Sequence, residues 1–127
     1  MIKDFLIINF TGKNNAVGLR IDNNFFVKKY QTNISSNETI IKNILDFLRE
    51  NKVKINKNIS IITNLGPGSF SAVRISLAIA KGIQISKGSR LYGYKNSNLG
   101  EFTLKNIEFL ISKNLIENKL IKPVYLS

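Results

Sequence analysis

Cysteine and histidine are absent from this sequence of 127 residues. Without thiol or imidazole groups the chain cannot build a Ser-His-Asp or Cys-His nucleophile pair, or a zinc or iron site based on those ligands. It also cannot form disulfides, which fits a reducing compartment. The missing residue types therefore exclude the commonest kinds of hydrolase and redox site.

Acidic residues are also scarce, with eight in all. Paired carboxylates would be needed for acid-base catalysis or for a magnesium site. None of the eight forms a pair near the glycine-rich loop described below. We therefore predict no catalytic residue and no metal site. The eight are Asp4, Asp22, Glu38, Asp46, Glu50, Glu101, Glu108 and Glu117.

Long apolar runs are missing too. No stretch approaches the roughly 18 apolar residues of a membrane span, and the first ten residues lack the pattern of a cleavable leader. The length suits one domain covering residues 1–127. We expect a cytoplasmic protein.

Positive charge is abundant, with a formal net charge of +11. Lysine and arginine can bind nucleic-acid phosphates, so a small basic RNA-binding module is one hypothesis. However, the chain has 20 Ile, 17 Asn and 15 Lys, residues that share A/T-rich codons. The lysines are scattered and are not interleaved with aromatic residues, so this hypothesis stays an alternative.

The centre of the chain combines a strand, a glycine-rich loop and a long helix. A β-branched run at 59–63 predicts a buried strand, Gly66-Pro67-Gly68 predicts a turn, and 72–86 predicts a helix that stops at Gly88. Backbone N–H groups at such a turn could hold a phosphate, or the turn could be purely structural. Its spacing is neither that of a P-loop nor that of a dinucleotide fingerprint.

The remaining segments predict an α/β fold. Residues 5–31 read as a three-stranded antiparallel meander, and 90–94 as a last strand parallel to the first. A capping box at 35–38 opens an amphipathic helix over 37–50, and apolar recurrence over 103–118 predicts a third helix. Residues 104–127 would then form a C-terminal helix and tail.

The helix at 72–86 is apolar on all sides instead of along one stripe. Such a helix must be covered on all sides. Either a partner protein covers its outer face, or the helix lies between the sheet and the C-terminal helix.

One motif resembles a known family. The sequence GPGSFSAVRI from Gly66 to Ile75, followed by AIAKG at 78–82, is similar to the GPGSFTGxRxGxxxAKG signature of the TsaB (YeaZ) family, with Ser71 and Ala72 in place of Thr-Gly. The segment Pro123-Val124-Tyr125-Leu126 also resembles the end of full-length TsaB proteins. Most of a second lobe would be missing between roughly Leu99 and Leu104.

The resemblance implies a function and a fold. TsaB proteins are the non-catalytic partner of the TsaD subunit in the bacterial complex that forms threonylcarbamoyladenosine beside the tRNA anticodon. They have an actin-like or ribonuclease-H-like fold. It implies for this chain a single such lobe, a TsaD-like catalytic partner, a TsaE-like ATPase in the same complex, tRNA bound through that complex, and a homodimer as a further option.

It also suggests where partners bind. The expected interface uses the first two helices, and the loop motif comprises Gly66, Pro67, Gly68, Ser69 and Phe70. The interface residues expected are Ile41, Leu45, Leu48, Arg74, Leu77, Ala78 and Lys81.

The first strand departs from the family pattern. Asn9 stands where actin-like ATPases have an aspartate that helps hold the metal with the nucleotide. An amide is a poorer magnesium ligand than a carboxylate, so we expect no cofactor and no useful ATP binding by the chain alone. A degenerate nucleotide-binding lobe of an actin-like ATPase is the enzyme-class alternative.

Overall fold

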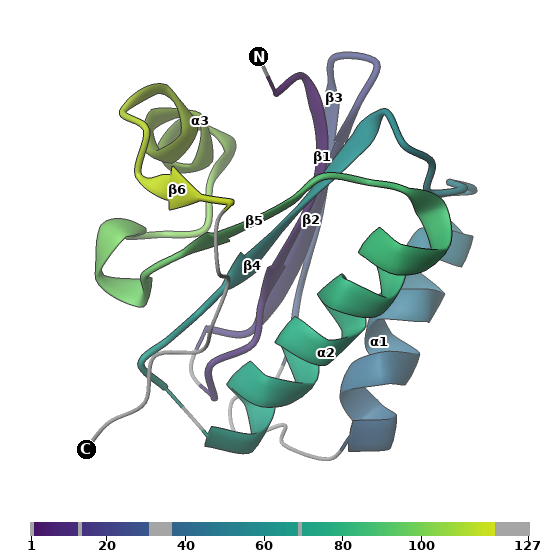
Figure 1. The fold of residues 1–127 in the computed structure, drawn as a ribbon, viewed down its shortest axis with the longest axis horizontal. Helices are drawn as coiled ribbons and strands as arrows, with labels where there is room; N and C mark the ends of the chain where they lie inside the picture. The colour runs from purple at the N-terminus through teal and green to yellow at the C-terminus, as the bar shows by residue number, and fades with distance from the viewer. Residues whose placement is uncertain (1, 13, 31–36, 69, 119–127) are drawn as a thin grey trace.

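The computed structural model describes residues 2–12, 14–30, 37–68 and 70–118 as one six-stranded sheet with helices on both faces (Figure 1). The strand order is β3-β2-β1-β4-β5-β6. In chain order the elements are β1 (Asp4–Asn9), β2 (Ala16–Ile21), β3 (Asn24–Lys29), α1 (Asn37–Glu50), β4 (Ile59–Asn64), α2 (Phe70–Lys87), β5 (Leu91–Tyr94), the 3₁₀ turn η1 (Asn96–Asn98), α3 (Leu104–Ser112) and β6 (Ile116–Glu117).

The first three strands form the predicted antiparallel meander. β1 pairs with β2, and β2 pairs with β3, with Ile21 opposite Asn24. Asp22 and Asn23 connect β2 to β3, and both have positive φ, which is the backbone that a two-residue hairpin turn requires. Local turn chemistry thus sets this register.

The remaining long strands extend the meander as parallel strands. β4 lies beside β1 and β5 lies beside β4, both in parallel, as predicted. β1 is therefore central, and its run of apolar residues is buried on both faces. Gly88, with φ of +71°, ends α2 where a helix stop was predicted.

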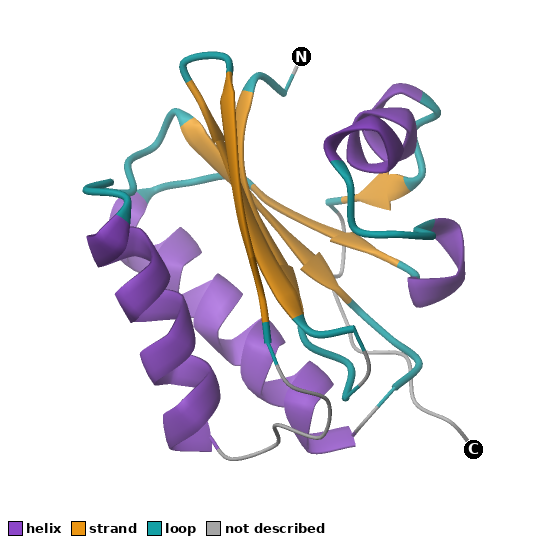
Figure 2. Ribbon diagram, turned by 180° about the vertical axis from the view of Figure 1, so that it is seen from behind, coloured by secondary structure: helices purple, strands orange, loops and turns teal. Residues whose placement is uncertain are grey.

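Helices lie on both faces of the sheet (Figure 2). An apolar cluster of buried side chains lies on each face. Alternate residues of β1 supply them: Leu6 and Ile8 pack with α1 and α2, whereas Phe5 and Ile7 pack with α3. Because α3 lies on the opposite face of the sheet from α2, it does not cover the outer side of α2. The arrangement with α2 between the sheet and the C-terminal helix is wrong.

The third helix is shorter than predicted. It begins at Leu104, capped by Thr103, and ends at Ser112 instead of continuing to residue 118. Asn114 takes a left-handed conformation with φ of 58°, its N–H bonds Ile111 O, and the N–H of Leu115 bonds Leu110 O. This is a Schellman stop built on asparagine, and it turns the chain into β6, antiparallel to β5.

Ser35 and Ser36 of the predicted capping box, and the tail from 119 to 127, lie outside the described residues. Within the described part of the chain, no helix combines the length and apolarity needed to cross a membrane.

Candidate functional site

Four polar side chains meet where the parallel strands end, and we call them the strand-end knot: Asn9, Asn64, Tyr94 and Asn96. Asn64 Nδ2 donates to Asn9 Oδ1 at 2.6 Å and to Asn96 Oδ1 at 3.0 Å. The Tyr94 hydroxyl donates to Asn9 Oδ1 at 2.9 Å. Asn9, Asn64 and Tyr94 are buried, so the knot is part of the interior.

The topology brings the knot together. Asn9, Asn64 and Tyr94 are the last residues of β1, β4 and β5, which are adjacent parallel strands. The carboxyl edge of such a sheet is where ligands bind in open α/β folds. The knot therefore occupies the usual ligand-binding end of the sheet, and it includes Asn9, which stands where actin-like ATPases have an aspartate.

The bonding of Asn9 leaves this place poorly suited to a cation. Its Oδ1 already accepts two hydrogen bonds, and its Nδ2 donates to Asn14 O at 3.1 Å. An amide carries no negative charge, so binding a metal ion would not compensate for the loss of these hydrogen bonds. Among the described residues, no group of three or more histidine, cysteine, aspartate or glutamate side chains could hold a metal ion.

Burial also keeps the knot neutral. Desolvation raises the pKa of the Tyr94 hydroxyl far above its usual value, and a hydrogen bond involving Asn64 offsets this only in part. Tyr94 therefore stays protonated and donates to Asn9. The knot fastens three strand ends through dipoles alone.

The glycine-rich loop packs on the knot and on the first turn. Gly66 N donates to Asn64 Oδ1 at 2.7 Å, and Gly66 has a φ of +90° that suits glycine. A Cβ on Gly68 would lie 2.7 Å from Thr11 Cβ, so only glycine allows this close approach. The structural-turn interpretation explains both glycines, while Ser69 and the Phe70 side chain lie outside the described atoms and phosphate binding stays a prediction.

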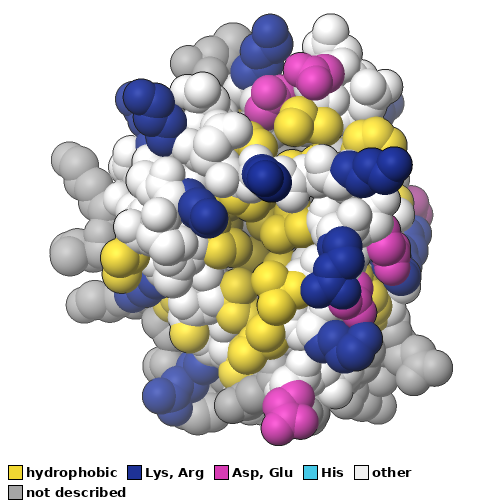
Figure 3. All heavy atoms as spheres, turned by 90° about the vertical axis from the view of Figure 1, so that its right-hand side faces the viewer, with side chains coloured by type: hydrophobic (Ala, Val, Ile, Leu, Met, Phe, Trp, Pro, Cys, Tyr) yellow, Lys and Arg dark blue, Asp and Glu magenta, His cyan; other side chains and the backbone are white. Residues whose placement is uncertain are grey.

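A second region of interest is the outer surface of α1 and α2. Ile41 and Leu45 on α1 are 41% and 53% exposed, and Leu48 is half-buried. Their spacing of four and three residues places them on one flank of α1. Figure 3 shows hydrophobic side chains gathered in a band on this face of the molecule, bordered by lysine and arginine.

The predicted interface residues of α2 do not share one environment. Arg74, Ala78 and Lys81 are exposed, but Leu77 is only 4% exposed and belongs to the core against the sheet. The structure therefore corrects the prediction that Leu77 belongs to the partner interface, because this side chain faces the core. Ala80, another small residue of α2, is buried as well.

Sequence reasoning missed three residues of this surface. Ile75, Ile79 and Ile83 are half-buried and pack against the edge of the same core as Leu48. They recur every four residues, which puts them on one flank of α2. That spacing was the available signal. We call these three residues, with Ile41, Leu45 and Leu48, the α1–α2 apolar strip.

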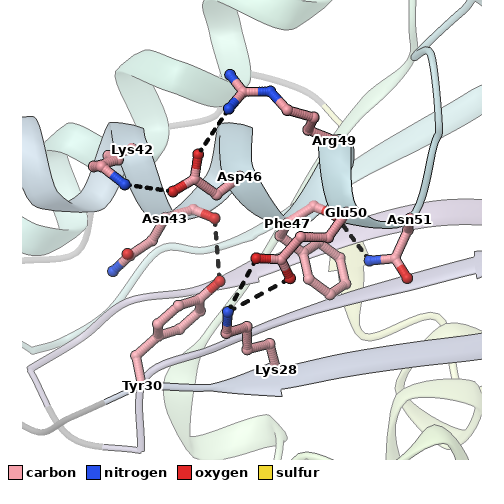
Figure 4. A network of polar contacts seen from close by, with 9 residues as sticks. All are labelled: Lys28, Tyr30, Lys42, Asn43, Asp46, Phe47, Arg49, Glu50 and Asn51. Atoms are coloured by element: carbon pink, nitrogen blue, oxygen red, sulfur yellow. Dashed lines mark hydrogen bonds and ion pairs between the residues drawn. The ribbon is translucent and has the colours of Figure 1, made fainter.

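Contacts with β3 and the residues after it hold the other flank of α1 (Figure 4). The Tyr30 hydroxyl donates to Asn43 O at 3.1 Å, and Lys28 Nζ lies 3.3 Å from Glu50 Oε1. Burial, with smaller contributions from Glu50 and Asp46, raises the pKa of Tyr30 to about 12. Burial of Ile40, Ile44 and Phe47 orients α1 on the sheet, and these contacts lie on the flank opposite Ile41 and Leu45.

Two ion pairs along α1 sit on its outer side. Asp46 accepts from Lys42 at 2.6 Å and from Arg49 at 3.3 Å. The hydrogen bond from Lys42 is the main reason that the pKa of Asp46 is lowered. Such exposed pairs contribute little to stability.

Comparison with known sequences gives one informative match. A segment of 42 residues, 33% of this chain, is 50% identical to the tRNA threonylcarbamoyladenosine biosynthesis protein TsaB of Buchnera aphidicola subsp. Baizongia pistaciae. Over this segment the chain is similar to a TsaB protein. The match covers 19% of that Buchnera TsaB, and no family model matches the chain.

Solved structures agree on the fold. YeaZ from Pseudomonas aeruginosa superposes with a TM-score of 0.65 at 17% identity, over 73% of this chain and 44% of that one. A crystal structure of an uncharacterized protein with similarity to peptidase YeaZ from Pseudomonas aeruginosa gives the same TM-score, identity and share of this chain, and covers 43% of its own length. The chain thus spans less than half the length of these YeaZ structures. The predicted actin-like, ribonuclease-H-like α/β lobe is confirmed.

Proposed function

We propose that this chain is a non-catalytic partner subunit in the formation of threonylcarbamoyladenosine in tRNA. The observation that carries the proposal is the 50% identity to a TsaB protein over 42 residues. The YeaZ-like fold supports it. In this role the chain binds a TsaD-like catalytic subunit in the cytoplasm, with a TsaE-like ATPase and tRNA in the same complex.

The α1–α2 apolar strip is the surface that we assign to the catalytic partner. Ile41 and Leu45 are large apolar side chains left exposed on one flank of α1. Exposed apolar side chains in a contiguous band mark interaction sites. Arg74 and Lys81 are exposed on α2 as well, so the partner surface should be apolar with acidic groups at its edge.

The strand-end knot supports the non-catalytic side of the proposal. Its amides and hydroxyl are bonded to one another and carry no charge. Such a site is suited to holding strands together, and chemistry would come from the partner. The knot also counts against the degenerate nucleotide-binding lobe as a function for this chain.

Two variants with matched exposure test the proposed surface. Leu45 on α1 is 53% exposed and Phe109 on α3, across the sheet, is 55% exposed. Leu45→Glu should weaken co-purification with the co-expressed TsaD-like protein of the same genome by at least about tenfold, as charges at apolar hot spots do. Phe109→Glu should leave it unchanged.

The cellular readout is the threonylcarbamoyladenosine content of tRNA in cells depleted of their own TsaB-like protein. The wild-type chain and Phe109→Glu should restore the modification, and Leu45→Glu should not. Equal co-purification of both variants would overturn the assigned surface. Restoration by none of the chains, despite normal folding and TsaD binding, would overturn the function. Sedimentation of the chain alone shows whether a second copy of itself occupies the strip instead.

A further inference from the structure

A cavity lies at the end of the sheet opposite the strand-end knot, where the parallel strands begin. Its volume is about 680 Å³, within the range of small-molecule sites. We call it the basic cavity. Its described lining residues are Ile2, Lys3, Lys57, Asn58, Ser60, Arg90, Tyr92, Ile111, Ser112, Asn114, Ile116 and Asn118.

Three cations reach this cavity from three neighbouring strands. Lys3 and Arg90 immediately precede β1 and β5, and Lys57 lies two residues before β4. Because these strands are parallel and adjacent in the order β1-β4-β5, their first residues share one edge of the sheet. Neighbouring strands lie only about 4.8 Å apart, so the three side chains can converge on one ligand.

No aspartate or glutamate carboxylate belongs to the described lining of the basic cavity. The ion pairs found in the described part of the chain involve none of the three cations. Two acidic residues are close in sequence: Asp4 follows Lys3, and Glu117 lies between the lining residues Ile116 and Asn118. Alternation places Asp4 on the same face as Leu6, toward α1 and α2, and Glu117 on the face opposite Ile116. The lining residues Tyr92, Ile111 and Ile116 pack with the apolar cluster on the α3 face, so the cavity lies on that face.

The other walls suit an anion with a planar or apolar part. Ser60 from β4 and the half-buried Tyr92 from β5 form the sheet side, and Asn58 and Asn114 add amide donors. The end of α3 lies at this cavity, and a helix C-terminus would normally repel an anion. Here the carbonyls of Phe109, Leu110 and Ile111 already accept bonds within the helix stop.

We propose that the basic cavity binds the phosphoryl group of a phosphorylated ligand, with Arg90 and Lys57 as its main contacts. Arginine presents a fork of donors that matches phosphate oxygens, and lysine adds a second charge. The phosphoryl group comes either from a free phosphorylated molecule or from the backbone of an RNA strand. The site does not rest on the proposed partner role.

Calorimetric titration of inorganic pyrophosphate into the full chain, without magnesium, tests the site. Arg90→Gln and Lys57→Gln should each weaken binding by about tenfold, because each removes a charge-assisted hydrogen bond. The matched control is Lys95→Gln, which removes one exposed cation at the other edge of the sheet and should change binding less than about twofold. Far-ultraviolet circular dichroism confirms that each variant is folded.

A parallel titration with a short oligouridylate separates the two sources. A loss in the cavity variants that is larger for the oligouridylate than for pyrophosphate assigns the site to an RNA backbone. An equal or smaller loss assigns it to a free phosphorylated molecule. The proposal is wrong if pyrophosphate fails to bind at millimolar concentration, or if the folded cavity variants bind it as tightly as the wild type and Lys95→Gln.

Discussion

At the scale of single residues, the strand-end knot shows how an uncharged side chain is accommodated where a carboxylate was expected. Asn9 stands at the position where a metal-binding carboxylate was expected, and its amide is engaged on both sides by Asn14, Asn64 and Tyr94. Each hydrogen bond of this kind contributes about 1 kcal/mol net, and leaving a buried partner unsatisfied costs more. The hydrogen bonds therefore stabilise Asn9 in its present arrangement relative to one in which its amide is free to bind a metal.

The raised pKa values of Tyr30 and Tyr94 predict that the folded chain is less stable at alkaline pH. Burial raises the pKa of Tyr30 to about 12 and that of Tyr94 further. An unfolded tyrosine titrates near pH 10, so this contribution is fully present below about pH 10 and is lost as the pH rises through the folded values. The free energy of unfolding should fall between about pH 10 and pH 12 because the unfolded chain releases protons that the folded chain retains.

Urea unfolding at pH 8 and at pH 11.5 measures this effect in the wild type and in Tyr30→Phe. The phenylalanine variant loses the bond to Asn43 O and is less stable at pH 8. Its further loss on going to pH 11.5 should be smaller than that of the wild type. Equal losses would mean that Tyr30 titrates normally in the folded chain.

At the scale of elements, the stability of the chain should respond differently to a charge on the core face of α2 and to a charge on the outer flank of α1. Leu77 is buried against the sheet, whereas Leu45 on α1 is exposed. Leu77→Glu should destabilise the chain by about 3 kcal/mol or more, because it buries an unpaired charge. Leu45→Glu should change stability by less than about 1 kcal/mol.

Thermal and urea unfolding of both variants check this contrast. If Leu77→Glu unfolds at the same urea concentration as the wild type, Leu77 is not a core residue. If Leu45→Glu unfolds as readily as Leu77→Glu, its failure to bind a partner would no longer locate a surface.

The same elements show what the sequence could predict. Alternation, helical spacing and turn residues were enough for the meander, for α1 and for the parallel strands, because each signal is local. The inward face of α2 was not predictable, since a helix apolar on all sides gives no phase, and only packing distinguishes Leu77 from Ile75. The end of α3 was missed because apolar residues recur past Asn114, which takes the left-handed turn more often made by glycine.

The strand-end knot was predictable only at one of its residues, whereas three residues of the α1–α2 apolar strip, Ile41, Leu45 and Leu48, followed from helical spacing. The expected absence of a carboxylate directed attention to Asn9, but its partners Asn64 and Tyr94 are 55 and 85 residues away. Strand alignment alone brings them together. A polar residue at the end of each predicted parallel strand was the signal that could have joined them.

At the scale of the whole molecule, the chain corresponds to less than half of the YeaZ structures that it resembles. We predict that magnesium does not increase its affinity for ATP, because Asn9 brings no charge and has no free amide atom. Calorimetric titration of ATP with and without magnesium should give the same affinity or, with magnesium, a weaker one. Stoichiometric binding that appears only with magnesium would favour the nucleotide-binding alternative.

The strand order also leaves β3 as an edge of the described sheet. An edge strand with exposed Phe26 and Val27 offers a template on which another extended chain could add. The exposed Lys29 beside them and the net charge of +11 oppose that addition by repulsion between copies. Salt screens such repulsion. The molecule should therefore resist aggregation through β3 at low ionic strength and lose that resistance in concentrated salt.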